Sequence, residues 1–320
     1  MNNPLTPFPD ARGFAVLDGG LATALEERGH RLDTSLWSAR LLLDAPDEIG
    51  AGHRAYLEAG ADCITTASYQ ASFPGLEAAG LGDAEAEACL VRSVHLALDA
   101  RDDFASERGG LRPLVAASVG PYGAYLADGS EYRGRYGVGR GELDHFHRRR
   151  FELLAASGAD LIACETLPSA AEAEVLLGIL DDVPGVWAWM SFACADASRL
   201  ADGTPFVDAV GACSTHERVA AVGVNCTHPR FVAALLERAA EVTTLPLIAY
   251  PNSGEKYDAT SRRWSGDAEP SRWLEGVETW LAAGARVIGG CCRVGPSDIR
   301  HLRARLVASR GGTGSLRDES

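Results

Sequence analysis

The sequence predicts one closed (β/α)8 barrel. Short apolar runs alternate with helical patterns eight times along the 320 residues. No change of composition and no linker divides the chain into halves. We therefore expect a barrel over residues 13–309, preceded by a leader of residues 1–12 and followed by a flexible tail of residues 310–320. An open, doubly wound sheet is the alternative.

The predicted strands are short runs of apolar and β-branched residues, bounded by Gly, Pro or polar side chains. They are expected at residues 14–17, 63–68, 113–119, 161–164, 186–192, 219–224, 247–249 and 287–288.

The predicted helices have apolar residues three and four positions apart. Gly29 and Gly60 end the first two, Ser169 caps another, and Pro296 opens the last one. The helices are expected at residues 21–28, 46–59, 83–104, 142–156, 169–180, 205–212, 231–242, 271–283 and 296–308.

Residues 122–139 mix Tyr, Gly and Arg without periodicity, after the third strand. Such a segment is more typical of a long loop over a pocket than of a packed element. We expect a loop that can act as a lid.

The composition limits the partners and the compartment. A net charge of −14 without a Lys/Arg-rich block repels nucleic acid and anionic membranes. No apolar run approaches the roughly 20 residues that cross a bilayer, and the first residues lack the pattern of a secretion signal. We expect a cytoplasmic protein with reduced thiols, monomeric or weakly homo-oligomeric, that acts on small molecules.

Polar side chains follow the predicted strands. In a β/α barrel these positions meet at one face, where active sites lie. They are Asp18, Thr66, Ser118, Glu165, Ser191, Cys226, Tyr250, Asn252, Cys291 and Cys292.

Three of these residues form a candidate metal site. Cys291 and Cys292 follow the last predicted strand. Cys226 follows the strand at residues 219–224, which is two strands earlier in the chain. Three thiolates bind a soft ion such as Zn²⁺ and leave the fourth position of a tetrahedron open, as in catalytic sites. His228 is an alternative fourth ligand, and a disulfide between the adjacent cysteines is a further alternative.

The other five cysteines are interpreted as small buried apolar residues. These are Cys63, Cys89, Cys164, Cys194 and Cys213.

A zinc ion with three thiolates is a weak Lewis acid and is better suited to a thiol substrate than to water. It would lower the thiol pKa from about 8.5 and favour S-alkylation. Asp18 and Glu165 can bind the ammonium group of an amino-acid thiol, and the N–H groups of Gly19 and Gly20 can bind its carboxylate. Thr66 can add a hydroxyl.

Aromatic residues near the same face are candidates for contact with a sulfonium methyl donor through cation–π attraction. They are Trp37, Tyr122 and Tyr125.

From about residue 13 to residue 306, the chain resembles the homocysteine S-methyltransferases. The motifs that carry the resemblance are Asp18-Gly19-Gly20-Leu21-Ala22-Thr23, Leu36-Trp37-Ser38-Ala39, Thr65-Thr66-Ala67-Ser68-Tyr69-Gln70, Val224-Asn225-Cys226, Tyr250-Pro251-Asn252-Ser253-Gly254 and Gly289-Gly290-Cys291-Cys292-Arg293.

The resemblance implies a zinc-dependent barrel in which homocysteine sulfur completes the coordination by the three cysteines. It also implies that Asp18, Gly19, Thr66 and Glu165 bind homocysteine. The branch that uses S-methylmethionine looks closest, because the betaine-using branch has an aromatic residue at the position of Gln70 and a longer C-terminal arm. S-adenosylmethionine is expected to be a poorer donor, and selenium-containing acceptors remain open.

Two other functions remain possible from the residues alone. One is a barrel lyase or hydrolase that uses Asp18 and Glu165 as acid and base. The other is a zinc-storage or sensor protein.

Overall fold

The computed structural model describes residues 2–30, 40–258, 263–265 and 273–311. Eight parallel strands form one sheet in the order β1-β10-β7-β6-β5-β4-β3-β2. The strands are β1 (Ala15–Val16), β2 (Cys63–Thr65), β3 (Leu114–Val119), β4 (Leu161–Leu167), β5 (Ala188–Phe192), β6 (Val219–Asn225), β7 (Leu247–Tyr250) and β10 (Ala285–Ile288).

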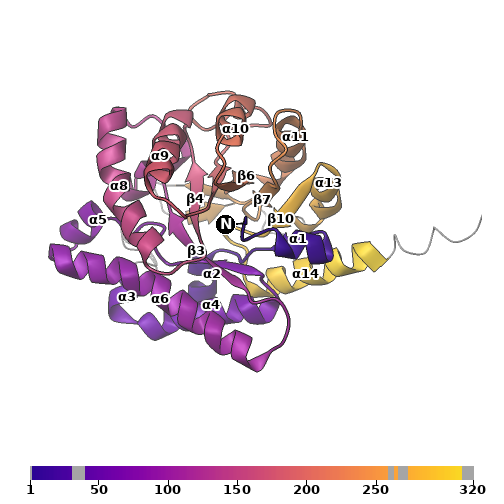
Figure 1. Ribbon diagram of the computed structural model, residues 1–320, viewed down its shortest axis with the longest axis horizontal. Helices are drawn as coiled ribbons and strands as arrows, with labels where there is room; N and C mark the ends of the chain where they lie inside the picture. Colours follow the sequence, from indigo (N-terminus) through magenta and orange to yellow (C-terminus); the bar gives the residue numbers. More distant parts are fainter. Residues whose placement is uncertain (1, 31–39, 259–262, 266–272, 312–320) are drawn as a thin grey trace, which may run out of the picture.

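The first and second strands close the sheet into a barrel. Leu17 forms a parallel bridge with Cys63, and the Asp62 N–H donates to Val16 at 2.7 Å. The helices surround the strands as an outer ring (Figure 1). The structure confirms the predicted (β/α)8 barrel and excludes the open sheet.

The main outer helices follow the strands in the predicted order. They are α2 (Leu21–Glu27), α4 (Pro46–Ala59), α6 (Asp83–Glu107), α8 (Arg140–Ala156), α9 (Ala170–Asp182), α10 (Phe206–Ser214), α11 (Pro229–Ala240), α13 (Val277–Ala282) and α14 (Pro296–Gly311). The helix predicted at residues 271–283 is described only in part, because residues 266–272 lie outside the described chain.

Several short elements were not predicted. Their sequences lack a long apolar period, which is the signal that identifies a helix or strand. They are α1 (Pro7–Arg12), α3 (Leu41–Asp44), α5 (Phe73–Ala78), α7 (Tyr122–Leu126), η2 (Ser130–Tyr132), and the antiparallel pair β8 (Lys256–Asp258) and β9 (Arg263–Ser265).

The expectation of an unpacked loop at residues 122–139 is therefore wrong in part. The rings of Tyr122 and Phe146 lie 4.9 Å apart, and Tyr122 and Tyr136 lie 5.5 Å apart. These contacts hold the segment against α8, because aromatic pairs at such distances add packing energy to their buried area.

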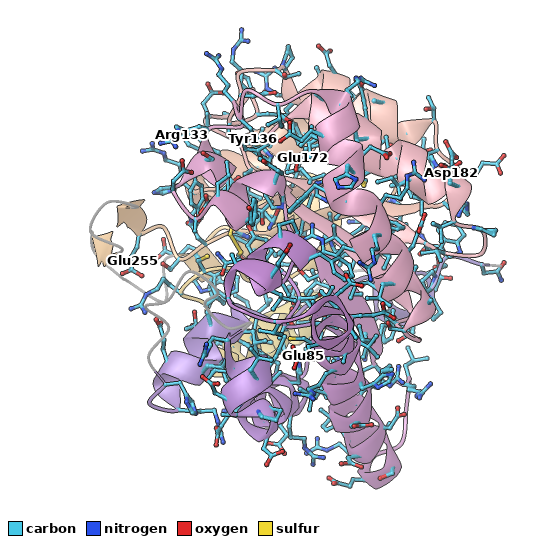
Figure 2. All side chains as sticks on the ribbon, turned by 90° about the vertical axis from the view of Figure 1, so that its left-hand side faces the viewer. Glu85, Arg133, Tyr136, Glu172, Asp182 and Glu255 are labelled. Atoms are coloured by element: carbon cyan, nitrogen blue, oxygen red, sulfur yellow. A yellow bond between two sulfur atoms is a disulfide. The ribbon has the colours of Figure 1, made fainter. Side chains whose placement is uncertain are left out.

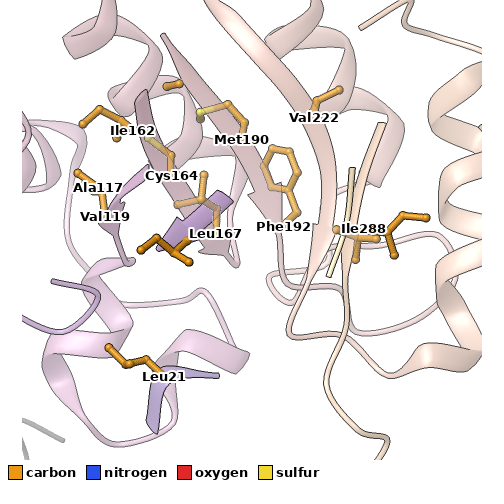
Figure 3. Close-up of a cluster of buried hydrophobic side chains, with 14 of the residues drawn as sticks. Leu21, Ala117, Val119, Ile162, Cys164, Leu167, Met190, Phe192, Val222 and Ile288 are labelled. Atoms are coloured by element: carbon orange, nitrogen blue, oxygen red, sulfur yellow. The ribbon is translucent and has the colours of Figure 1, made fainter. Parts of the chain in front are cut away.

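The core has two layers, because side chains alternate across each strand. Ala163 and Trp189 belong to the cluster inside the barrel. Ile162 and Met190 belong to the cluster that packs beneath the helices (Figure 3).

The N-terminal segment closes one end of the barrel. Leu5 and Phe8 are buried in the interior cluster, and the Asn3 side chain donates to the carbonyl of Ala220 at 2.8 Å. In Figure 1 the N-terminus lies at the centre of the ring of strands. No helix in the described ranges is long and apolar enough to cross a membrane.

Candidate metal and substrate site

The candidate residues lie at the C-terminal ends of the strands, on one face of the barrel, because all eight strands run parallel. Asp18 and Thr66 follow β1 and β2, and Glu165 lies within β4, which is longer than predicted. Cys226 follows β6. Trp37 lies outside the described residues.

The three cysteines meet at this face. Ligand atoms of Cys226, Cys291 and Cys292 all lie within 4.8 Å of one another, and the sulfurs of Cys226 and Cys292 are 3.5 Å apart. Cys226 and Cys291 are joined as a disulfide, with their Cα atoms 5.5 Å apart. The adjacent residues Cys291 and Cys292, considered above as a disulfide, are not bonded to each other.

The donor set fits a soft metal ion once the Cys226–Cys291 bond is reduced. Zn–S bonds of about 2.3 Å place tetrahedral sulfur ligands roughly 3.8 Å apart, and these sulfurs already lie within 4.8 Å of one another. In the protein alone, burial raises the pKa of the Cys292 thiol to about 12, and the charge of Glu131 adds to this. A bound cation would therefore favour the thiolate form.

His228 is not part of this group. Its Nδ1 accepts a hydrogen bond from the Arg230 N–H at 3.2 Å and so caps α11. Among the described residues, the atoms that share one metal position come from the three cysteines. The structure thus gives His228 a capping role in place of the fourth metal ligand considered above.

The end of β7 and the loop after it fix the backbone of all three cysteines. The N–H of Cys226 donates to Tyr250 at 3.2 Å, and the N–H of Cys291 donates to Pro251 at 2.8 Å. The Cys292 carbonyl accepts from the Ser253 N–H at 3.1 Å. The order of residues along the chain gave no sign of this shared support.

Left-handed backbone conformations occur at the strand ends that carry the site. They are rare and costly in residues other than glycine and cluster at functional sites. The φ angles are +60° at Thr166, +46° at Cys226 and +65° at Arg293. These residues follow or include Glu165, Cys226 and Cys292, so three of the four non-glycine residues with positive φ in the described chain lie at the candidate site, the fourth being Ala127.

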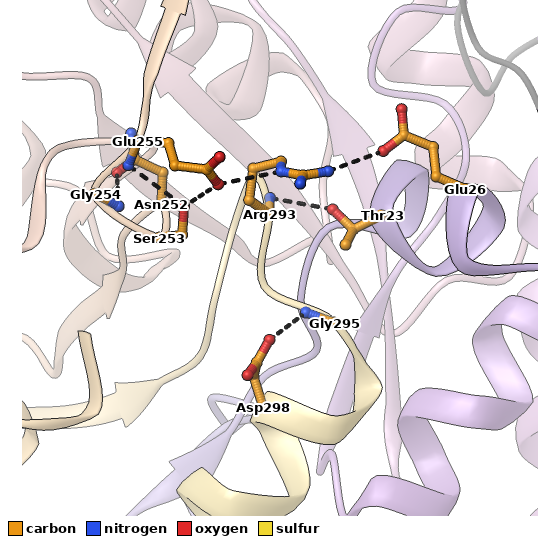
Figure 4. A network of polar contacts seen from close by, with 9 residues as sticks. All are labelled: Thr23, Glu26, Asn252, Ser253, Gly254, Glu255, Arg293, Gly295 and Asp298. Carbon is orange, nitrogen blue, oxygen red and sulfur yellow. Dashed lines mark hydrogen bonds and ion pairs between the residues drawn. The ribbon is translucent and has the colours of Figure 1, made fainter. Parts of the chain in front are cut away.

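A polar network holds the turn after Cys292 (Figure 4). The Arg293 N–H donates to the Thr23 hydroxyl at 3.1 Å, and its guanidinium donates to Glu255 at 3.1 Å and reaches Glu26 at 3.4 Å. A Cβ on Gly290 would lie 2.1 Å from Val294, so only glycine permits this close turn.

A second pair of side chains, Thr166 and Asn225, was not singled out from the sequence. The buried Asn225 side chain accepts from the Thr166 N–H and donates to the Thr166 hydroxyl, both at 2.7 Å. This exchange joins the ends of β4 and β6 and positions Glu165 relative to Cys226.

Asp18 and Glu165 form a buried pair of carboxyl groups. They are 3% and 7% exposed, and no ion pair to either is found within the described chain. Burial raises the pKa of Asp18 well above its usual range, and the charge of Glu165 raises it further, although hydrogen bonds from Thr65 oppose this. Burial raises the pKa of Glu165 to about 7 against hydrogen bonds from Ser118 and Tyr250. A cationic ligand would relieve both costs.

Two other predicted residues lie beside this pair. The buried Thr66 hydroxyl accepts from the Ser118 N–H at 3.0 Å and shares a 2.6 Å hydrogen bond with Ser68. A Cβ on Gly19 would lie 2.2 Å from the Val294 carbonyl oxygen. The Gly20 N–H donates to that oxygen at 3.0 Å. The expectation that Gly20 offers its N–H group to a ligand is therefore wrong.

The fold and the site define the class of protein. It is a β/α-barrel protein with a cluster of three cysteines and a buried acidic pair at the C-terminal face. This combination suits a metal-assisted reaction of a sulfur-containing amino acid.

Comparisons with known proteins narrow this to one family. The homocysteine S-methyltransferase model matches residues 15–306. Homocysteine S-methyltransferase YbgG of Bacillus subtilis is 45% identical over 94% of this chain and 97% of its own. Homocysteine S-methyltransferase of Escherichia coli is 47% identical over 95% of this chain and 99% of its own. The chain belongs to the homocysteine S-methyltransferase family.

A solved structure agrees with the sequence comparisons. The metallated form of the homocysteine methyltransferase MmuM of Escherichia coli superposes with a TM-score of 0.86, at 44% identity, over 95% of this chain and all of that chain. An oxidised form of the same protein superposes with a TM-score of 0.87. The chain is therefore an enzyme of this family, which removes the storage protein and the lyase or hydrolase as alternatives.

Proposed function

We propose that the protein transfers a methyl group to the sulfur of L-homocysteine at a zinc site, with S-methylmethionine as the preferred donor and S-adenosylmethionine as a poorer one. The observation that carries this proposal is the convergence of three cysteine sulfurs within 4.8 Å on the same face as the buried acidic pair. Zinc fits the three thiolates better than a hard ion, which prefers oxygen ligands.

Cys226, Cys291 and Cys292 hold the metal in this proposal. When bound, zinc supplies an open coordination position that holds homocysteine sulfur as the nucleophilic thiolate at neutral pH. The end of β7 and the loop after it keep the three cysteine backbones in place through their hydrogen bonds with Tyr250, Pro251 and Ser253.

The amino-acid end of homocysteine lies against β1, β2 and β4. Asp18 and Glu165 bind its ammonium group, which supplies the cation that the buried pair lacks. The Gly19 N–H has no hydrogen-bond acceptor among the described residues and can donate to the substrate carboxylate. Thr66, held by Ser118 and Ser68, lines the same side.

The reaction needs no proton transfer at carbon. The thiolate sulfur forms a bond to the methyl carbon, the bond from that carbon to the sulfonium sulfur breaks, and its electron pair stays on the departing thioether. With S-methylmethionine, donor and acceptor both become methionine. The protein contributes mainly by holding the three reacting atoms in line.

Homologues support the acceptor more directly than the donor. The names of the relatives specify homocysteine, and the choice of S-methylmethionine rests on the resemblance described above. Gln70 is buried and donates to the Ala124 carbonyl at 3.3 Å, so it lies between the end of β2 and α7.

A parallel turnover assay tests the donor. Metal-loaded protein and homocysteine are combined with S-methylmethionine, S-adenosylmethionine or betaine, and methionine is measured. We expect kcat/KM to be highest for S-methylmethionine, lower for S-adenosylmethionine and at background for betaine. Preference for betaine would contradict the assignment of the donor, and the absence of turnover with every donor would contradict the proposed function.

Zinc X-ray absorption tests the role of the thiol. The metal in loaded protein should show three sulfur ligands from the cysteines, and adding homocysteine should raise the sulfur count by one. Methionine, whose sulfur carries a methyl group, serves as the control and should leave the count unchanged. An unchanged sulfur count with homocysteine would remove the thiolate step.

A further inference from the structure

The segment that contains α7 and η2 places Glu131 beside the metal site. The side chain of Tyr132, its neighbour, is hydrogen-bonded to the Cys292 sulfur, and the charge of Glu131 acts on that same sulfur and on Tyr69. A Cβ on Gly123 would lie 2.4 Å from the Glu131 nitrogen, so α7 and η2 are in close contact.

A buried network fixes both ends of this segment. Glu172 of α9 accepts from the Tyr122 N–H at 2.6 Å and from the Tyr136 hydroxyl at 2.9 Å (Figure 2). His147 Nδ1 faces the Arg150 guanidinium at 3.0 Å and acts as an acceptor there, so its Nε2–H donates to Glu172 at 2.9 Å. Glu131 is thus held by packed structure on both sides.

The Glu131 carboxyl group is buried and lacks a compensating partner among the described residues. It is 8% exposed, and its Oε2 is buried without a hydrogen-bond partner in the part of the chain that the structure describes. The nearest arginine in sequence, Arg133, is 61% exposed and pairs with Asp128 at 3.4 Å instead. A buried carboxylate oxygen without a donor is costly, and such groups in native proteins call for an explanation.

We propose that Glu131 binds the α-ammonium group of the sulfonium methyl donor and so sets the preference for donors that are amino acids. This inference rests on the proposed function, because it assigns the second substrate of that reaction. Asp18 and Glu165 already serve the ammonium group of the acceptor, so a second amino acid at the same face needs an acidic group of its own.

The chemistry favours the ammonium group over the sulfonium centre. A sulfonium has no N–H to donate, whereas an ammonium group can donate to the unpartnered oxygen of Glu131 and compensate its charge. Glu131 lies on the segment that also contacts Cys292, so it is near the three cysteines but on an element separate from β1 and β4.

The test compares wild type with Glu131→Gln, a variant of the same shape without the charge. With S-methylmethionine, we expect the donor KM to rise at least about tenfold, which corresponds to the loss of one charged hydrogen bond. The KM for homocysteine and the zinc content should stay the same. Glu131→Asp, which keeps the charge, should recover part of the donor affinity.

A sulfonium donor without an amino group gives the sharpest comparison. With a dimethylsulfonium carboxylate, wild type and Glu131→Gln should have donor KM values within about twofold of each other, because this donor offers nothing for Glu131 to bind. The exposed Glu237→Gln on α11 is the matched control and should leave all KM values unchanged.

Two outcomes would overturn the inference. In one, Glu131→Gln leaves the KM for S-methylmethionine unchanged. In the other, it raises the KM for homocysteine or for the amino-free donor by the same factor, which would indicate a general structural role. If wild type shows no turnover, the proposed function fails, and calorimetric binding of S-methylmethionine to the two proteins still decides the role of Glu131.

Discussion

Cys291→Ala is expected to abolish metal binding and to lower kcat/KM for methyl transfer at least about a thousandfold. Loss of a metal that contributes several kcal/mol to the reaction has this scale, since about 1.4 kcal/mol corresponds to a factor of ten. The barrel should stay folded, because Cys291 lies after the end of β10 and its N–H would still donate to Pro251. Metal content, turnover and far-UV circular dichroism measure the three effects.

Cys213→Ala is the matched control for loss of a thiol. Cys213 is buried in α10 and is not part of the three-cysteine cluster, so this variant should keep its metal and its activity and lose only some packing energy. Full metal content in Cys291→Ala would show that this cysteine is not a ligand. Unfolding of that variant would show that the site is needed for the fold.

Glu165→Gln is expected to raise the homocysteine KM at least about tenfold, the scale of one charged hydrogen bond. The exposed Glu237→Gln on α11 serves as the control and should behave as wild type. An unchanged KM for homocysteine would remove Glu165 from the acceptor site.

Glu165→Gln should also make the ligand-free protein more stable than wild type at neutral and higher pH. The Glu165 pKa of about 7 lies above its ordinary value of 4.5. The unfolded chain therefore loses its proton first as pH rises. The stability that protonated Glu165 contributes is fully present below about pH 4.5 and is lost as pH rises to about 7, roughly 3 kcal/mol in all.

Urea unfolding of wild type and Glu165→Gln between pH 4.5 and pH 8 measures this effect. The wild type should lose stability relative to the variant across that range, and the difference should level off above pH 7. A constant difference would mean that Glu165 is ionised in the folded protein throughout. Opposite changes in stability and in substrate affinity are expected where a binding site holds an uncompensated charge.

The barrel could be predicted because each strand and helix has its own local pattern. The positions of Asp18, Glu165 and the three cysteines follow from the same pattern, since the ends of parallel strands share one face. Their chemical types then indicated a metal and an amino acid.

Other features depend on contacts between segments that are far apart in sequence. The exchange between Asn225 and Thr166 joins residues 59 positions apart, and the loop after β7 supports Cys291 through a backbone carbonyl. Neither contact has a local sequence signal. Glu131 was overlooked because it lies in a segment without periodicity, and only its burial distinguishes it from a surface carboxylate.

Leu5 and Phe8, which close one end of the barrel, decide by which end substrates and products can exchange. With one end of the barrel sealed by apolar side chains, both amino acids and both products of the proposed reaction exchange through the opposite rim. In the proposed function, both substrates bind at that rim, the acceptor at Asp18 and the donor at Glu131.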